Sequence, residues 1–238
     1  MIPIAAGIAV FVFMALFVYA LVKGTKDFDR LREQILDQFA IENGFEFGDA
    51  SRFDLREKIR NFAIIGVAEN KIVHAAWKEQ EGVRFYVFDQ VRVTRGGSST
   101  RGGLLTICLV EARSQGLDTV IFSTANRMEA KLSRKMTGKR LGLAPVTTGD
   151  PDFDNRFVLF SQSPSMVLRM LDCGLKNLLV TEANKISLPL MIQIRENGIV
   201  VHNTGDRPKT IKNVDEIRTL VNLAKWVLDT LSADIGTN

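Results

Sequence analysis

The three aspartates of the segment GDPDFDN have the residue type and spacing that metal chemistry would need. Asp150, Asp152 and Asp154 stand at alternate positions, as do the first oxygen ligands of a calcium-binding loop. The loop pattern then fails, because its sixth position is Asn155 rather than glycine. Its twelfth position is Ser161, which cannot supply the bidentate carboxylate that completes such a site. A calcium loop is therefore not indicated.

The same segment is better interpreted as structural. We expect a capped acidic turn in which Phe153 and Phe157 pack inward, followed by a strand over 156–161. The alternative is a metal-assisted hydrolase in which the three aspartates bind the metal. We assign no catalytic, cofactor-binding or metal-binding residue on this pattern.

A glycine-rich loop, TRGGSSTRGG at 94–103, has some features of a phosphate-binding loop. Backbone N–H groups of such loops can bind phosphate, and Arg95 and Arg101 add positive charge. A P-loop, however, requires a lysine near its end, and a dinucleotide-binding loop must join a strand to a helix. This loop lacks the lysine and joins two predicted strands, so we interpret it as a flexible hairpin tip.

Histidine and cysteine are too few and too dispersed for zinc or nucleophilic chemistry. The chain contains only His74, His202, Cys108 and Cys173, and no two of them have the spacing of a zinc site. Cys108 lies in an apolar predicted strand, where a buried thiol is unreactive.

The segment from 127 to 140 concentrates positive charge. It contains six basic residues and one acidic residue, Glu129, which gives it a local charge of +5 in a chain whose formal charge is +4. The excess of positive charge is therefore one patch, which indicates an anionic lipid surface or a protein partner. Nucleic acid is disfavoured because the segment has no aromatic residue for base stacking. The alternative is an ordinary solvated helix face. The six bases are Arg127, Lys131, Arg134, Lys135, Lys139 and Arg140.

The amino-terminal segment is apolar, and no charged residue occurs before Lys23. As a helix, residues 2–22 would span about 31 Å, which matches a hydrocarbon core of roughly 30 Å. The bases that follow predict, by the positive-inside rule, a cytoplasmic carboxyl-terminal domain and an outside amino terminus. A cleaved signal peptide is the alternative, but it needs a basic start. We therefore expect a transmembrane anchor over 1–24 in the bacterial inner membrane.

The remaining chain has the pattern of one α+β domain. A juxtamembrane helix over 25–44 should precede a domain over 45–238, in which helices cover one face of an antiparallel sheet. The final helix begins at Asn213 and carries one apolar stripe. Other helices are expected over 126–136 and 163–179. Strands are expected over 62–68, 71–78, 83–93, 104–111, 117–123, 156–161, 190–195 and 199–203.

The order of these features resembles a family of uncharacterised bacterial single-span membrane-anchored proteins with a late GD-x-x-FD-x-x-F segment. The motif is present here as Gly149, Asp150, Phe153, Asp154 and Phe157. The resemblance covers most of the chain and implies the fold and the membrane location. It implies no activity and no catalytic residues.

Together these features predict a membrane-tethered cytoplasmic interaction domain, without evident catalysis, that binds a protein partner, an anionic lipid surface or both. The six bases of the 127–140 segment are its candidate binding residues. One alternative is a subunit of a larger membrane complex, with Trp77 or Trp226 at the interface. The other is the metal-assisted hydrolase described above.

Overall fold

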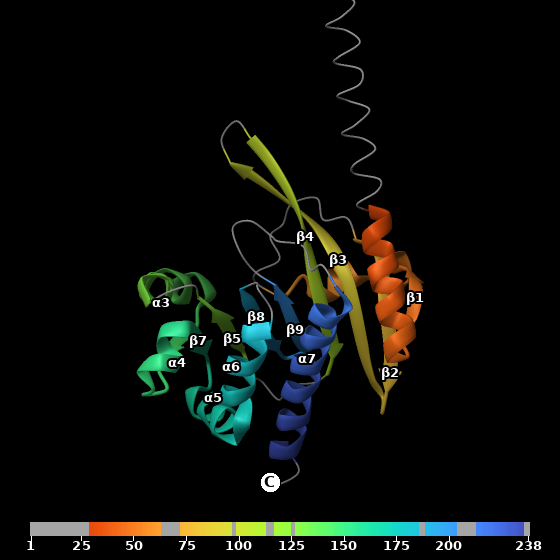
Figure 1. Cartoon of the computed structure of the whole chain (residues 1–238). Helices are drawn as coiled ribbons and strands as arrows, with labels where there is room; N and C mark the ends of the chain where they lie inside the picture. The colour runs from red at the N-terminus through yellow and green to blue at the C-terminus, as the bar shows by residue number, and fades with distance from the viewer. Residues whose placement is uncertain are drawn as a thin grey trace, which may run out of the picture.

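In the part of the chain that the structure describes, a nine-stranded antiparallel sheet forms the centre of the molecule (Figure 1). The computed structural model describes residues 29–62, 72–96, 99–112, 117–124, 127–185, 189–203 and 213–235. The strand order is β1-β2-β3-β4-β9-β8-β5-β7-β6, and every neighbouring pair is antiparallel. The predicted α+β class and antiparallel sheet are thus confirmed.

The first half of the described chain builds one side of the sheet. A helix described over 29–43 is followed by β1 (Glu46–Asp49), the short helices η1 (Ala50–Phe53) and α2 (Leu55–Ile59), β2 (Ile72–Gln80), β3 (Val83–Gly96) and β4 (Ser99–Glu111). The strands β3 and β4 run further than expected, because their pairing continues through most of the glycine-rich loop to Gly96 and Ser99.

The second half builds the other side. Its elements are β5 (Thr119–Ser123), α3 (Arg127–Leu141), β6 (Ala144–Val146), α4 (Pro151–Arg156), β7 (Phe157–Ser161), α5 (Pro164–Met170), the π-helical turn η2 (Leu171–Leu175), α6 (Lys176–Lys185), β8 (Leu190–Arg195), β9 (Gly198–Asn203) and α7 (Val214–Ile235). The predicted helix over 163–179 is kinked, since Gly174 has a positive φ of 113° inside it.

The hairpin β8–β9 joins the two halves of the sheet. Its predicted Asn-Gly turn is confirmed, with Arg195 paired to Gly198. β9 pairs with β4, and β8 pairs with β5, so the hairpin lies between strands that precede it by many residues. Sequence spacing gave no indication of this insertion.

One face of the sheet carries the main core. The buried residues of α7 include Ile217, Leu220, Ala224 and Val227, which confirms the predicted apolar stripe. They pack in one cluster with residues of α5, α6 and the 29–43 helix, including Phe39. The helix that precedes the sheet therefore belongs to the same hydrophobic core.

The opposite face is also covered, so the expectation of helices on one face only is wrong. Leu55 and Ile59 of α2 pack there against Tyr86 and Phe88 of β3. Ala130 of α3 packs on the same face over β5 and β7. The reason is that the strands are apolar on both faces. Val87 and Phe88, for example, are successive residues on opposite faces of the sheet, and both are buried. Each face must therefore be covered to remove it from water.

The expected fold class also requires a correction concerning the membrane. We expected a transmembrane helix over 1–24, and that segment lies outside the described residues. Within the part of the chain that the structure describes, no helix is both long enough and apolar enough to cross a bilayer. The fold is therefore α+β with a large antiparallel sheet, and a transmembrane helix is not part of the architecture described here.

Of the expected hairpin of 62–68 with 71–78, only the second strand lies mostly within the described residues. Residues 63–71 lie outside the described ranges, whereas β2 is present. The described neighbours of β2 are β3 and the edge strand β1, where Phe47 pairs with Ala76. Strand β1 was not predicted, because four residues with a glycine at the third position give too short a pattern.

Candidate functional site

The GDPDFDN segment forms a short helix rather than the expected turn. Asp150 is the N-cap of α4, and its carboxylate accepts hydrogen bonds from the backbone N–H groups of Asp152, at 3.0 Å, and Phe153, at 3.2 Å. Pro151 occupies the first helical position, where a missing N–H costs nothing. The sequence contained this cap signal, but six residues are too few for a periodic apolar pattern to reveal a helix.

Asp150 has a second structural partner. Its other carboxylate oxygen forms an ion pair with Lys176 at the start of α6. The Lys176 ammonium group, and next the N–H of Phe153, lower the pKa of Asp150 below its ordinary value of 3.8. The carboxylate is thus held in its charged form by contacts that join α4 to α6.

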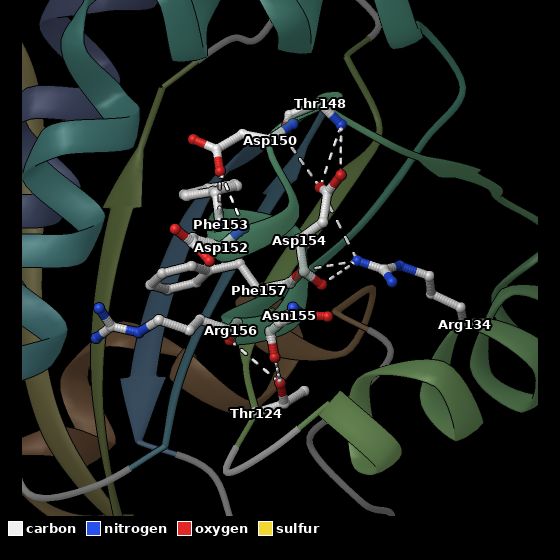
Figure 2. Close-up of polar contacts among 10 residues, drawn as sticks. All are labelled: Thr124, Arg134, Thr148, Asp150, Asp152, Phe153, Asp154, Asn155, Arg156 and Phe157. Atoms are coloured by element: carbon white, nitrogen blue, oxygen red, sulfur yellow. Dashed lines mark hydrogen bonds and ion pairs between the residues drawn. The ribbon is translucent and has the colours of Figure 1, made fainter.

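Asp154 is directed to the other side of α4 (Figure 2). Its carboxylate accepts hydrogen bonds from the backbone N–H of Thr148, at 3.1 and 3.2 Å, and from the Thr148 hydroxyl at 3.1 Å. Arg134 of α3 lies 3.9 Å away from it as an ion pair. Asp154 therefore fixes the chain that precedes α4.

The three aspartates consequently do not form a common ligand set. Asp150 and Asp154 contact different partners, and Asp152 is exposed (Figure 2). Among the residues that the structure describes, no group of three His, Cys, Asp or Glu side chains is placed to hold a metal ion. The geometry gives the segment a structural role.

Two aromatic rings anchor this segment in the core, as predicted. Phe153 and Phe157 are both buried, and their ring centroids lie 4.7 Å apart in a stacked arrangement. They belong to the main cluster beneath α5 and α6. The motif residues of the GD-x-x-FD-x-x-F segment therefore act together as a cap, an anchor and a brace between α3, α4 and α6.

The histidines and cysteines remain apart. Cys108 of β4 pairs with Val201 of β9, and His202 follows Val201 on the opposite face of the sheet. Burial raises the pKa of the Cys108 thiol, which makes it unreactive. Cys173 is exposed on η2, and His74 of β2 stacks on a neighbouring ring. No cysteine–histidine pair is formed by these four residues.

Helix α3 holds the predicted basic residues. Arg127, Lys131 and Lys135 are exposed along it. Between them lie two apolar side chains that sequence analysis had not selected, Met128 with 80% and Leu132 with 58% of their surface exposed. We call these five residues the α3 outer face. The spacing of the two apolar residues, one helical turn apart, was the signal that could have identified them.

Arg134 is used differently from the other bases. It is only partly exposed, and its guanidinium donates hydrogen bonds to the backbone carbonyls of Asp154 and Phe157. These carbonyls belong to the last turn of α4 and the start of β7 (Figure 2). Arg134 thus ties α3 to the acidic segment. The side chains of Lys139 and Arg140, also predicted as binding residues, lie outside the described part of the structure.

Small residues mount α3 closely on the sheet. Ala130 is buried in the cluster with Phe160, and Gly138 lies so near that a Cβ atom there would be 2.7 Å from Phe160 Cε1. Together with the Arg134 contacts, this close approach fixes the rotation of α3. The α3 outer face therefore points away from the sheet and into solvent.

No family model, curated protein or solved structure matches this chain. The resemblance to the family with the GD-x-x-FD-x-x-F segment therefore stays a prediction. The α3 outer face is the feature of the described structure that points to a function.

Proposed function

We propose that the protein is an interaction domain that binds an anionic phospholipid surface through the α3 outer face. The observation that carries this proposal is the combination of Met128 and Leu132, largely exposed, with the exposed bases Arg127, Lys131 and Lys135 on one rigidly mounted helix. A helix that rests on a bilayer surface needs both components, because bases attract the headgroups and apolar side chains enter the acyl boundary.

The magnitudes favour weak, reversible binding. Three bases near an anionic surface contribute about 1 kcal/mol each, and Glu129 offsets about 1 kcal/mol. Partial burial of Met128 and Leu132 adds about 1–2 kcal/mol each, below the 1.5–3 kcal/mol of full burial. The sum of about 4–6 kcal/mol corresponds to a dissociation constant near 1 mM or somewhat lower. Such a helix positions a domain on a membrane surface without fixing it there permanently.

This proposal also fixes the expected location. Anionic phospholipids give the cytoplasmic leaflet its negative surface potential, so the cytoplasmic face of the membrane is where the α3 outer face would find its ligand.

The tryptophans are less suited to the alternative of a subunit in a larger complex. Trp77 packs against Phe53, with ring centroids 4.7 Å apart, and belongs to the cluster under α2. Trp226 of α7 packs against the main core and lies close to Gly174. Both rings thus have partners within the chain, which leaves the α3 outer face as the better candidate surface.

The experiment must report on α3 itself, because the apolar sequence of residues 2–22 can adsorb the chain to vesicles of any composition. An environment-sensitive fluorophore is attached to the full chain at Ser133→Cys, beside Leu132. Cys173→Ser removes the exposed native thiol, and the buried Cys108 does not react. The emission of the α3 reporter is recorded with neutral phosphatidylcholine vesicles and with vesicles containing phosphatidylserine.

We expect a blue shift with phosphatidylserine that fades as salt rises, because the Debye length falls from about 10 Å at 0.1 M to about 3 Å at 1 M. Changing Arg127, Lys131 and Lys135 to glutamine should lower the ratio of docked to undocked α3 about 100-fold. An equal shift with both vesicle types at all salt concentrations would refute an electrostatic lipid contact. No shift with either would leave the protein partner as the occupant of this face.

Two matched controls separate the α3 outer face from general effects of charge and hydrophobicity. For charge, Arg30, Arg52 and Lys225 are changed to glutamine, since they are exposed on other elements. For hydrophobicity, Leu31→Gln with Ile41→Gln is compared with Met128→Gln plus Leu132→Gln, because these four are exposed apolar residues. Only the α3 variants should reduce the shift.

A further inference from the structure

The paired strands β3 and β4 extend beyond the rest of the sheet. The pairing of β2 with β3 is recorded as far as Ile72 with Gln90, and that of β9 with β4 as far as Ile107 with His202. Among the described strands, residues 91–96 and 99–104 therefore pair only with each other. We call this two-stranded extension the β-arm, and Figure 1 shows it projecting past the helices.

The sequence of the β-arm is exclusively basic among its charged residues. Between Asp89 and Glu111 the chain has three arginines and no acidic residue. The tetrapeptide TRGG occurs at 94–97 and again at 100–103, and the register pairs Arg95 with Thr100 and Arg101 with Thr94. Arg92 pairs with Gly103, which places it diagonally across from Arg101 on the same face of the ribbon, whereas the register places Arg95 on the other face.

This composition suits phosphate esters. Guanidinium groups bind phosphate oxygens in a bidentate manner, which a lysine ammonium cannot do. Glycines at 96, 102 and 103 carry no side chains, so a surface can approach the ribbon backbone closely. A two-stranded ribbon has only marginal stability in water, and a ligand that neutralises its charge would stabilise it.

Phospholipid headgroups fit the β-arm better than nucleic acid. The chain contains no aromatic residue between Phe88 and Phe122, so the β-arm offers no ring on which bases could stack. Its tip, GGSS, also lacks the apolar wedge with which ribbons unstack base steps. Contact with headgroup phosphates requires neither feature.

We propose that the β-arm is a second contact with anionic phospholipid, in which Arg92 and Arg101, placed on one face by the strand register, bind headgroup phosphates. This inference rests on the proposed function of α3 and deepens it, because two contacts on one surface bind more tightly than either alone. The protein would then be held on the membrane at two separate points, the α3 outer face and the β-arm.

The test uses a second reporter on the full chain. The same fluorophore is attached at Ser99→Cys in the Cys173→Ser background, and its emission is compared between neutral and phosphatidylserine vesicles. We expect a response to anionic vesicles only. Changing Arg92 and Arg101 to serine should abolish it and should also lower the docked ratio of the α3 reporter by at least tenfold, since each arginine contributes about fivefold.

The outcomes separate the two proposals. If the α3 reporter responds while the β-arm reporter stays silent and the arginine variants leave α3 docking unchanged, the β-arm inference is overturned and the proposed function stands. If neither reporter responds, both fail. A duplex DNA of equal phosphate concentration that shifts the β-arm reporter more than the vesicles do would overturn the assignment to lipid. The variant that combines Arg30→Ser with Arg52→Ser is the charge-matched control, because both residues are exposed on other elements.

Discussion

The buried ion pair between Arg32 and Asp89 allows the sharpest test of how the 29–43 helix is held on the sheet. Arg32 donates to both carboxylate oxygens at 2.8 Å, and the two side chains are only 5% and 11% exposed. Thr106 joins the same cluster, with its hydroxyl 2.7 Å from Asp89. Removing one member of a buried pair leaves the other charge without compensation in a medium of low dielectric constant.

We therefore expect Arg32→Met and Asp89→Leu each to lower the free energy of unfolding by about 3–5 kcal/mol. The double variant removes both charges and substitutes apolar groups of similar size, so its free energy of unfolding should lie within about 1 kcal/mol of the wild type. Urea unfolding of the full chain, followed by tryptophan fluorescence, measures all three variants. The essential result is that the losses of unfolding free energy in the two single variants do not add up in the double variant.

An exposed pair in the same sheet provides the control. Arg84 and Glu79 are each 58% exposed and lie 2.9 Å apart, so Arg84→Met should leave the free energy of unfolding nearly unchanged. If Arg32→Met costs no more than this control, or if the double variant is as unstable as the sum of the single variants, the reasoning from burial is refuted.

Three other predictions concern the acidic segment and the cysteines. Phe157→Ala should lower the free energy of unfolding by about 3–5 kcal/mol in a denaturant titration, because it empties a fully buried site. Since Lys176 lowers the folded-state pKa of Asp150, this carboxylate stabilises the fold above its ordinary pKa of 3.8 and loses that effect as the pH falls through the lowered value. Asp150→Asn should therefore show a smaller loss of thermal midpoint between pH 5 and pH 2 than the wild type. A thiol reagent should modify one cysteine, Cys173, in the native protein and also Cys108 after denaturation, as counted by mass spectrometry.

The strands were the part of the fold that could best be predicted from sequence. Continuous β-branched and aromatic runs such as VRFYVFDQVRV carry a local signal, and the Asn-Gly turn specifies its own hairpin. The apolar stripe of α7 was equally clear, because eight residues repeat at helical spacing. What these patterns could not supply was the strand order, since the placement of β8–β9 between β4 and β5 depends on contacts between distant segments.

The candidate site was harder to predict, because residues of the same type in one segment lie in different surroundings in the fold. Within one basic segment, Lys131 and Lys135 are exposed while Arg134 binds carbonyls of the acidic segment. Only the rotation of α3, set by the close approach of Gly138 to Phe160, separates these roles. A sequence pattern shows where charged residues occur, whereas their exposure in the fold determines which of them can bind a partner.

The surroundings of the acidic residues likewise explain why, among the described residues, we propose an interaction surface rather than a catalytic site. Asp150 and Asp154, the most promising acids in the sequence, are engaged with Lys176 and Thr148 within the fold. A general acid or a metal ligand needs a carboxylate directed into a site that a substrate can reach. The Asp154 carboxylate instead lies beside Arg134 of α3, whose guanidinium donates to the carbonyls of Asp154 and Phe157. Helix α3, held in this way, presents positive charge beside the exposed side chains of Met128 and Leu132. The acidic motif thus supports the helix that carries the α3 outer face. Under the function we propose, changes to this motif should weaken membrane docking only through the position of α3.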